Sequence, residues 1–325
     1  MKTADLGGPL LASVSRSFYL TIRILPHGLR APIGLAYLLA RASDTIADTA
    51  DAPAAVRLHH LAAFETMIRT GSPAGIAALQ RDIRPSAAGE VQLIADLDRC
   101  LAWLATLPDA DRREIAAVME KIIRGQTLDL QRFATPGTIV ALQTATELDE
   151  YTYLVAGCVG EFWTRICLQH LPHYARLQAA ELTRLGISYG QGLQLVNILR
   201  DAPADLRDGR CYLPADELRA AGSTPESLVH TPALARPVFD HWTHLAHGRL
   251  QDGFTYIRAL RPARLRAGCF LPWYLGQETL RLLTAHPPLE SAAKIKIPRR
   301  TVRRALLLAL PIAWSDRALE ALAPR

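Results

Sequence analysis

Residues 29–50, LRAPIGLAYLLARASDTIADTA, carry the pattern that decides the fold class. They follow the helix breaker Pro26-His27-Gly28, and their apolar side chains recur at the spacing of a helix with a buried face. The same spacing recurs along most of the chain, whereas the alternation typical of strands is nearly absent. The sequence therefore predicts an all-α protein.

Prolines, glycines and polar clusters divide this helical pattern into about ten segments. The predicted helices span residues 29–50, 54–70, 90–106, 109–133, 142–170, 174–201, 232–260 and 264–285, with a basic helix starting near 298. From residue 202 to residue 223, prolines and glycines predict turns and not a helix. No G-x-G-x-x-G motif follows a strand pattern, and no repeat or low-complexity linker divides the sequence. We therefore expect one all-α domain over residues 1–325.

The composition is globular, because 50% of the 325 residues are hydrophobic and 21% are charged. The 37 basic and 31 acidic residues leave a net charge of +6, which favours an anionic partner such as a diphosphate, an acidic lipid surface or nucleic acid. The five cysteines are odd in number and form no C-x-x-C pair, so the sequence favours a reducing compartment and predicts a cytoplasmic protein. No apolar stretch approaches the ~20 residues that a membrane span needs.

The first candidate site lies within residues 29–50. Asp44 and Asp48 are four residues apart, so both carboxylates project from one face of the helix, one turn from each other. Tyr37 and Arg41 extend the same face. A like-charged pair at this spacing destabilises a helix slightly, which favours a bound cation beside it.

A second candidate site, residues 197–205 (NILRDAPAD), repeats this spacing. Asn197, Asp201 and Asp205 follow one another every four residues, and Gln194 lies one turn earlier. Pro203 interrupts the segment, so the helix is expected either to end near Asp201 or to bend.

Two such pairs suggest a metal-bridged diphosphate site. Oxygen ligands suit Mg²⁺, which is commonly held by a few carboxylates together with substrate phosphates. Pairs facing each other across a helical cavity would polarise a diphosphate leaving group through Mg²⁺, and Arg41 and Arg200 would contact its oxygens. The alternative interpretation is that each pair belongs to a solvated helix face.

Four separated blocks together resemble the squalene/phytoene synthase family of head-to-head prenyl synthases, over roughly residues 15–304. The blocks are Ser15-Arg16-Ser17-Phe18, the segment from Asp44 to Asp48, residues 151–160 (YTYLVAGCVG), and residues 197–205 continued by 209–214 (GRCYLP). The resemblance implies the isoprenoid-synthase α fold with a central cavity. One position departs from the family pattern, because Ala204 stands where an acidic residue usually precedes the last aspartate.

The resemblance also implies roles for residues. It places Mg²⁺ on Asp44, Asp48, Asp201 and Asp205, and it assigns Tyr151 to proton removal or to stabilising a carbocation. The predicted substrate-binding residues are Ser15, Arg16, Ser17, Phe18, Tyr37, Arg41, Gln194, Asn197, Arg200, Arg210 and Tyr212.

Three features favour the squalene branch of the family. Thr45 follows the first aspartate, Cys269-Phe270-Leu271-Pro272 precedes Thr279-Leu280, and Lys294-Ile295-Lys296 resembles a stretch near the reductant site. This branch implies farnesyl diphosphate as substrate, presqualene diphosphate as intermediate and NADPH as cofactor. Trp273 stands where some squalene synthases carry a glutamine. The alternatives are synthesis of phytoene, dehydrosqualene or hydroxysqualene, or a non-catalytic helical relative.

Two further clusters are interpreted as surface features. His241, His244 and His247 lack the partner ligands of a metal motif and are taken as structural or surface histidines. The basic run of Lys294, Lys296, Arg299, Arg300, Arg303 and Arg304 lacks the interleaved aromatics of nucleic-acid readers. A solvated helix or peripheral contact with an anionic membrane is expected there, and no nucleic-acid partner.

Overall fold

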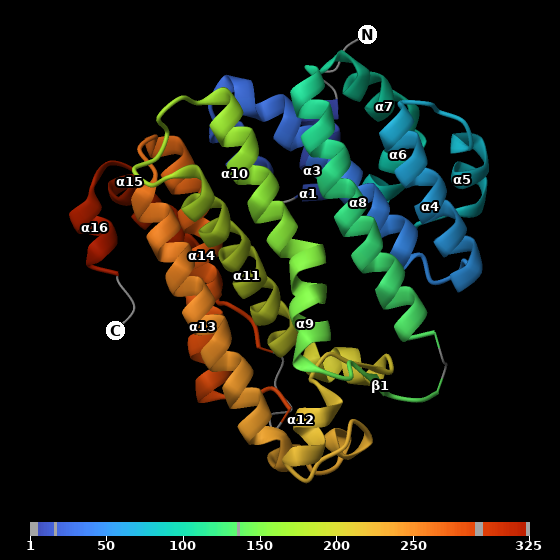
Figure 1. The fold of residues 1–325 in the computed structure, drawn as a ribbon, viewed down its shortest axis with the longest axis vertical. Coiled ribbons are helices and arrows are strands. Elements are labelled where there is room, and N and C mark those ends of the chain that lie inside the picture. The colour runs from blue at the N-terminus through green and yellow to red at the C-terminus, as the bar shows by residue number, and fades with distance from the viewer. Residues whose placement is uncertain (1–5, 16–17, 135–136, 290–294, 323–325) are drawn as a thin grey trace. The chain divides into compact units, whose positions relative to one another are not determined.

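The computed structural model describes residues 6–15, 18–134, 137–289 and 295–322 (Figure 1). These residues are predominantly helical, which confirms the predicted all-α class. They cluster in two compact units. The first consists of residues 1–134 and 165–172, and the second of residues 135–164 and 173–325. Across the described residues, no helix combines the length and the apolar character that crossing a bilayer requires.

The first unit is built around one helix, α3. Its elements are η1 (Leu6–Leu10), α1 (Leu11–Ser15), α2 (Phe18–Ile24), α3 (His27–Asp48), α4 (Ala54–Thr70), α5 (Ile76–Asp82), α6 (Ala88–Ala95), α7 (Leu97–Thr106) and α8 (Asp109–Arg132). Helices α1, α2, α4, α6, α7 and α8 all pack on α3. Because Leu35, Leu38 and Leu39 are fully buried, the apolar face of α3 forms the centre of this core.

Prolines set the starts of several helices at the predicted places. Pro26, Pro53 and Pro108 occupy the N-cap positions of α3, α4 and α8. Proline suits the start of a helix because backbone N–H groups there have no acceptor within the helix. Proline has no N–H, so none is left unpaired. Helix α4 ends as predicted at Thr70, where Gly71 takes a left-handed conformation and donates its N–H to the Met67 carbonyl at 2.8 Å.

The second unit is built around α11 in the same way. Its elements are β1 (Val140–Ala141), α9 (Ala145–Thr152), η2 (Tyr153–Gly157), α10 (Cys158–His170), α11 (Ala179–Arg207), β2 (Arg210–Cys211), α12 (Ala215–Ala220), η3 (Glu226–Val229), η4 (Pro232–Ala235), α13 (Arg236–Ala259), α14 (Ala263–Ala285), α15 (Arg299–Trp314) and α16 (Asp316–Glu320). Helix α10 runs on into the first unit from residue 165. Helices α13, α14 and α9, the π-helical turn η2 and strand β2 all pack on α11.

Glycines bring the backbone of α11 into direct contact with η2 and the first turn of α10. A Cβ atom added to Gly160 would lie 1.9 Å from the Gly186 carbonyl oxygen. One added to Gly190 would lie 2.4 Å from the Ala156 carbonyl oxygen. No side chain separates the two segments at these points, so a substituent there would have to displace backbone.

Three predicted helices differ from the structure. The segment predicted as 90–106 breaks at Asp96 into α6 and α7. The segment predicted as 142–170 is interrupted by η2, a π-helical turn of a kind often found at functional sites. The prediction that the helix ends near Asp201 is wrong, because α11 continues through Pro203 to Arg207. A proline in a helix removes one N–H donor, but the residues of α11 on both sides of Pro203 remain helical.

A short parallel strand pair was not predicted. Val140 pairs with Arg210 and Ala141 with Cys211, while Leu142 donates its N–H to the Cys211 carbonyl at 3.0 Å. The turn before β2 needs Gly209, whose φ is 78° and where a Cβ would lie 2.8 Å from the Thr138 carbonyl oxygen. Two residues per strand are too few for an alternating pattern to be visible in the sequence.

Candidate functional site

The first candidate site is a polar stripe along α3 in the first unit. Tyr37, Arg41, Asp44 and Asp48 recur every three or four residues, and each is partly or fully exposed while most of their neighbours on α3 are buried. The structure therefore brings these four predicted residues onto one face. The stripe exists because the opposite face of α3 supplies the core of this unit.

Asp44 carries the clearest electrostatic signal on this stripe. Burial of the carboxyl, reinforced by the neighbouring Asp48 carboxylate, raises the pKa of Asp44 to about 6. The Asp44 side chain keeps 46% of its accessible surface, so the burial comes from protein packed around the carboxyl and not from a cover over it. The raised pKa means that this site favours a positive partner, which can be a proton or a metal cation.

Arg41 lowers the pKa of Asp44 only at long range, and its effect is smaller than those of burial and of Asp48. Its guanidinium donates to the Glu90 carboxylate of α6, and its nearest nitrogen to the Asp44 carboxylate is 4.0 Å away. Asp44 instead accepts a hydrogen bond from the Gln126 amide of α8 at 2.6 Å. Glu90 and Gln126 were missed by sequence reasoning, because only tertiary packing brings α6 and α8 beside α3.

Other predicted residues of the first unit lie at the start of the chain. The Ser15 hydroxyl is buried and donates to the Leu11 carbonyl at 2.5 Å, so its proton is used inside α1. The Tyr37 hydroxyl donates to the Val14 carbonyl at 3.3 Å, which ties α3 to α1. Arg16 and Ser17 lie outside the described residues, as does the side chain of Phe18.

The second candidate site is a polar stripe along α11 in the second unit. Gln194 and Asn197 are joined by a 3.4 Å hydrogen bond between their side-chain amides. Arg200 holds both carboxylate oxygens of Asp201, at 3.0 Å from Nε and 2.5 Å from an Nη atom. This hydrogen bond raises the pKa of Arg200. Asp201 therefore contacts its neighbouring arginine at 2.5 Å, whereas Asp44 lies 4.0 Å from Arg41.

The C-terminal end of α11 meets strand β2 at a small depression. Asp205 lies one turn after Asp201 and lines this depression together with Arg210 and Tyr212. Tyr212 stacks on Tyr151 of α9 with 4.9 Å between ring centroids, and the Tyr151 hydroxyl donates to the Tyr212 hydroxyl at 3.4 Å. The unpredicted strand pairing of β2 with β1 fixes Arg210 here. Because α11 does not end at Asp201, Asp205 stays on the same helix.

A third polar group, on residues that sequence reasoning missed, supports the α9 end of this unit. The Asp149 carboxylate accepts from Arg249 of α13, and Gln191 of α11 donates to the Asp149 carbonyl at 3.2 Å. Tyr153 in η2 donates to Glu161 at 2.8 Å. These contacts join α9 to α11 and α13, and η2 to α10, and no local motif signals them.

The ligand chemistry of the α3 stripe fits a hard divalent cation. Two carboxylates lie one turn apart, and burial together with the Asp48 carboxylate raises the pKa of Asp44. On α11 a metal cation would share Asp201 with Arg200, because Arg200 already contacts this carboxylate. Within the parts of the chain that the structure describes, no three His, Cys, Asp or Glu side chains form a ready-made metal cluster.

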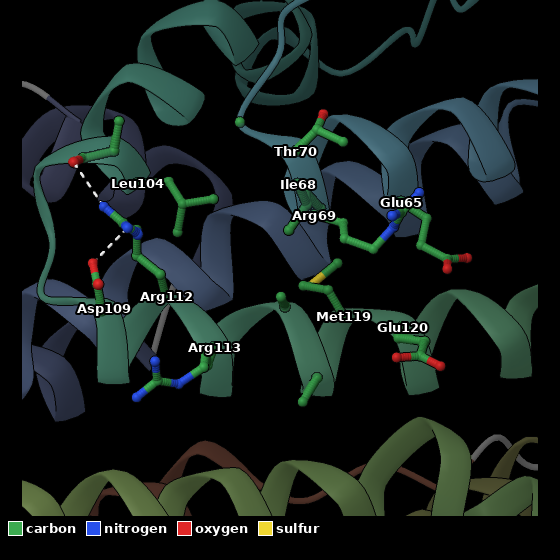
Figure 2. Close-up of a pocket in the computed structure, with 14 residues that line it drawn as sticks. Glu65, Ile68, Arg69, Thr70, Leu104, Asp109, Arg112, Arg113, Met119 and Glu120 are labelled. Atoms are coloured by element: carbon green, nitrogen blue, oxygen red, sulfur yellow. Dashed lines mark hydrogen bonds and ion pairs between the residues drawn. The ribbon is translucent and has the colours of Figure 1, made fainter.

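A surface pocket of about 700 Å³ lies elsewhere in the first unit, between α4, α7 and α8. Figure 2 shows its lining, in which Arg112 donates to Asp109 and Arg69 and Glu120 lie beside Met119. None of the predicted site residues lines it, so it does not belong to either stripe.

Comparison with known proteins identifies the fold and the family pattern. A sequence profile described as squalene/phytoene synthase matches residues 11–301. The chain superimposes on TcSQS, solved with the ligand E5700, with a TM-score of 0.79 and 20% sequence identity, covering 98% of this chain and 90% of that one. At this identity the likeness establishes the fold, which confirms the expected isoprenoid-synthase architecture.

Curated relatives from two branches are similar to the chain. The squalene synthase of Eremothecium gossypii is 29% identical over 304 residues, which cover 88% of this chain and 64% of that protein. The bifunctional lycopene cyclase/phytoene synthase of Colletotrichum graminicola is 29% identical over 233 residues, covering 68% of this chain and 36% of that protein. The chain thus spans less than two thirds of the length of either relative.

Proposed function

The chain belongs to the squalene/phytoene synthase family, a family of prenyltransferases, and we propose that it is a squalene synthase that condenses two molecules of farnesyl diphosphate. The observation that carries this proposal is the α3 stripe, where Asp44 and Asp48 share a face with Arg41 and Asp44 has a raised pKa. A carboxylate pair on one helix face beside an arginine suits a metal-bound diphosphate.

We assign the two stripes to the two diphosphate groups. Asp44 and Asp48 on α3, and Asp201 and Asp205 on α11, would hold Mg²⁺. Bound Mg²⁺ would supply Lewis-acid polarisation of the leaving diphosphate. Arg41 and Arg200 would donate to diphosphate oxygens, and each is now held by a carboxylate that the substrate would displace, Glu90 and Asp201.

The remaining predicted residues extend these roles. Asn197 and Gln194 would donate amide hydrogens to the same diphosphate as Arg200, and Arg210 would bind it from β2. Ser15, Arg16, Ser17, Phe18 and Tyr37 are proposed for the other substrate molecule.

Tyr151 is the proposed proton acceptor. In the first half-reaction, the donor loses diphosphate, its C1 bonds to the double bond of the acceptor, and loss of one proton closes the cyclopropane of presqualene diphosphate. The Tyr151 hydroxyl is oriented by Tyr212 and both rings are buried, so the phenol can relay this proton away from bulk water. Its ring face would also stabilise the allylic cation.

The second half-reaction requires a hydride, which we assign to NADPH. Presqualene diphosphate loses its diphosphate, rearranges, and accepts the hydride at carbon to give squalene. Trp273, at the position linked to the reductant, is buried in α14 and donates to the Leu250 carbonyl at 2.8 Å, so it packs in the core. Lys294 lies outside the described residues, which leaves Lys296 as the exposed cation of that segment.

The proposed product is a thirty-carbon hydrocarbon that dissolves in a bilayer and not in water. We therefore expect a cytoplasmic protein that contacts a membrane peripherally. No nucleic-acid partner is proposed, because the basic run of residues 294–304 lacks the interleaved aromatics of nucleic-acid readers.

Product analysis tests the proposal directly. Purified protein is incubated with farnesyl diphosphate and Mg²⁺, with and without NADPH, and the extracts are separated by gas chromatography–mass spectrometry after dephosphorylation. We expect squalene only with NADPH and presqualene alcohol without it. Dehydrosqualene or hydroxysqualene regardless of NADPH would contradict the squalene assignment but keep the condensation.

Geranylgeranyl diphosphate provides the second arm. Turnover of this longer substrate with farnesyl diphosphate untouched would identify phytoene synthesis. If neither substrate reacts, a thermal shift with Mg²⁺ and a non-hydrolysable farnesyl analogue separates two cases, because a ligand that binds the native state raises Tm. No shift would mean a non-catalytic relative.

A further inference from the structure

Helix α15 has an apolar face that the rest of the described chain leaves uncovered. Its core-facing side chains, among them Ala305, Ala309 and Ile312, are buried and pack toward α14. Its outward face carries Leu307, Leu310 and Trp314, which are 70%, 69% and 84% exposed. Leu306 adds to the same exposed side.

This exposure is unlike that of the other tryptophans. Trp103, Trp242 and Trp273 are buried, and Trp163 is partly buried. A single exposed tryptophan in line with leucines three or four residues apart forms one apolar stripe of about two turns. Scattered surface leucines are ordinary, whereas a contiguous stripe of this kind indicates a contact.

The positive charge of α15 lies on the same outward face as the exposed leucines. Arg299, Arg300 and Arg303 precede the leucines and are exposed, and Arg304 lies beside them. Among the described residues none of these four arginines forms an ion pair. From residue 291 to residue 315 the sequence has six basic and no acidic residues. The face therefore runs from cationic to apolar over roughly 22 Å from the first arginine to the tryptophan, at about 1.5 Å per residue.

We propose that the outward face of α15 is a docking surface for an anionic lipid bilayer. Its leucines and Trp314 enter the boundary between headgroups and acyl chains, and its arginines bind lipid phosphates beside them. Tryptophan is favoured at that boundary, and basic residues are attracted to anionic headgroups within a Debye length. An amphipathic helix binds a membrane in this manner without spanning it.

The charge pattern selects the bilayer over the other occupants. A second copy of this face would bring no acidic residue between 291 and 315 to meet the arginines. A nucleic acid would pair with the arginines and leave the leucines and Trp314 in water. An anionic membrane offers negative charge and an apolar layer side by side.

Vesicle flotation of the full chain tests this surface without substrate, so the result does not depend on the proposed reaction. Vesicles of phosphatidylcholine with phosphatidylglycerol are compared with vesicles of phosphatidylcholine alone. Leu307→Ser with Leu310→Ser should weaken binding about a hundredfold, since burial of each leucine is lost. Arg300→Gln with Arg303→Gln should weaken it about twentyfold on anionic vesicles and hardly at all on neutral ones.

Matched controls separate this surface from general stickiness. Val91→Ser with Val229→Ser removes two exposed apolar side chains outside α15. Arg84→Gln with Arg219→Gln removes two exposed arginines, also outside α15. Both should bind vesicles like the unchanged protein. The fluorescence of Trp314 should move to shorter wavelength on anionic vesicles, and Trp314→Phe should abolish that change while leaving Tm unaltered.

Three outcomes would overturn the proposal. Vesicle binding that the α15 variants and the controls share equally would place the contact elsewhere. A protein that fails to float but sediments as a dimer, and becomes monomeric with Leu307→Ser and Leu310→Ser, would make the face a contact between copies. Equal binding to neutral and anionic vesicles would remove the role of the arginines.

Discussion

The two aspartate-bearing helices, α3 and α11, share one sequence pattern and differ in electrostatic state. On α3 the neighbouring arginine is drawn away to Glu90, and Asp44 is left with a pKa of about 6. On α11 the neighbouring arginine holds Asp201 with two hydrogen bonds. The arginine therefore hydrogen-bonds to its neighbouring aspartate on α11, and to a glutamate of another helix on α3.

The difference shows what an i, i+4 aspartate pattern does and does not determine. Spacing on a helix fixes which carboxylates share a face. The charge state of that face depends on partners from other helices, here Glu90 of α6 and Gln126 of α8. Two motifs with the same aspartate spacing thus differ in the partners of their first aspartate, which are Gln126 on α3 and Arg200 on α11.

The largest expected effect comes from removing a carboxylate from either stripe. Asp44→Asn and Asp201→Asn should each lower kcat with farnesyl diphosphate by about a thousandfold, because each loses a charged ligand that stabilises the leaving diphosphate, an effect of several kcal/mol. Turnover at saturating Mg²⁺ is the measurement, with circular dichroism to verify folding.

Asp98→Asn is the matched control, because Asp98 is exposed on α7 and lies outside both stripes. It should keep normal turnover. If Asp44→Asn stays within tenfold of the unchanged protein while Asp201→Asn does not, then the α3 stripe does not hold a metal, and the two stripes differ in role as well as in charge.

The second effect concerns how the two helices are packed. Gly160→Ala would press a Cβ against the Gly186 carbonyl of α11, and should lower the free energy of unfolding by at least about 3 kcal/mol. Gly34→Ala on α3 is the control, because its nearest neighbour is the Leu11 side chain at 3.7 Å. It should be neutral or stabilise by up to about 1 kcal/mol, since alanine favours helix. Urea denaturation measures both, and equal losses would mean that α11 is no more tightly packed than α3.

Most of the fold could be predicted from the sequence, and the reason is physical. Helical periodicity is a local property, and prolines such as Pro53 and Pro108 mark helix starts wherever they occur. Of the two alternatives at Pro203, a helix end near Asp201 was wrong, because α11 continues to Arg207 while packing on α13 and α14. The strand pair β1–β2 and the turn η2 also escaped prediction, since both depend on tertiary contacts.

The candidate site was readable only in part. The stripes follow from spacing, and the structure places Tyr37, Arg41, Asp44 and Asp48 together as predicted. The partners that decide their charge come from distant positions, with Gln126 lying 82 residues from Asp44 along the chain. No single-sequence pattern links such positions. The roles of all these residues in binding and catalysis stay predictions.

The third prediction exchanges the electrostatic states of the two helices. Arg200→Gln frees Asp201 and makes α11 resemble α3, so the half-saturating Mg²⁺ concentration should fall while KM for farnesyl diphosphate rises about tenfold, the effect of losing a charge-assisted hydrogen bond. Glu90→Gln frees Arg41 to approach Asp44 and makes α3 resemble α11, so the half-saturating Mg²⁺ concentration should rise several-fold.

Opposite shifts in the Mg²⁺ requirement are the essential result. Glu65→Gln is a control for the loss of a carboxylate, because Glu65 lies on α4 outside both stripes. It should leave the Mg²⁺ requirement unchanged. Shifts of the same sign in Arg200→Gln and Glu90→Gln would mean that net charge, and not the local pairing, controls metal binding.

The smallest effect is on the pH dependence of stability in metal-free protein. The pKa of Asp44 is higher in the folded state, about 6, than its usual value of 3.8, so the folded protein binds this proton more tightly than the unfolded chain does. The resulting stabilisation is complete below about pH 4 and is lost as the pH rises through 6. Because the Asp44 side chain is 46% exposed, solvent screening should reduce the loss to about 1 kcal/mol. Urea midpoints in EDTA between pH 4 and pH 7 measure it, and Asp44→Asn should flatten this part of the curve, whereas Asp201→Asn should retain it. If both variants keep the slope, Asp44 is not the titrating group and the electrostatic contrast between α3 and α11 does not hold.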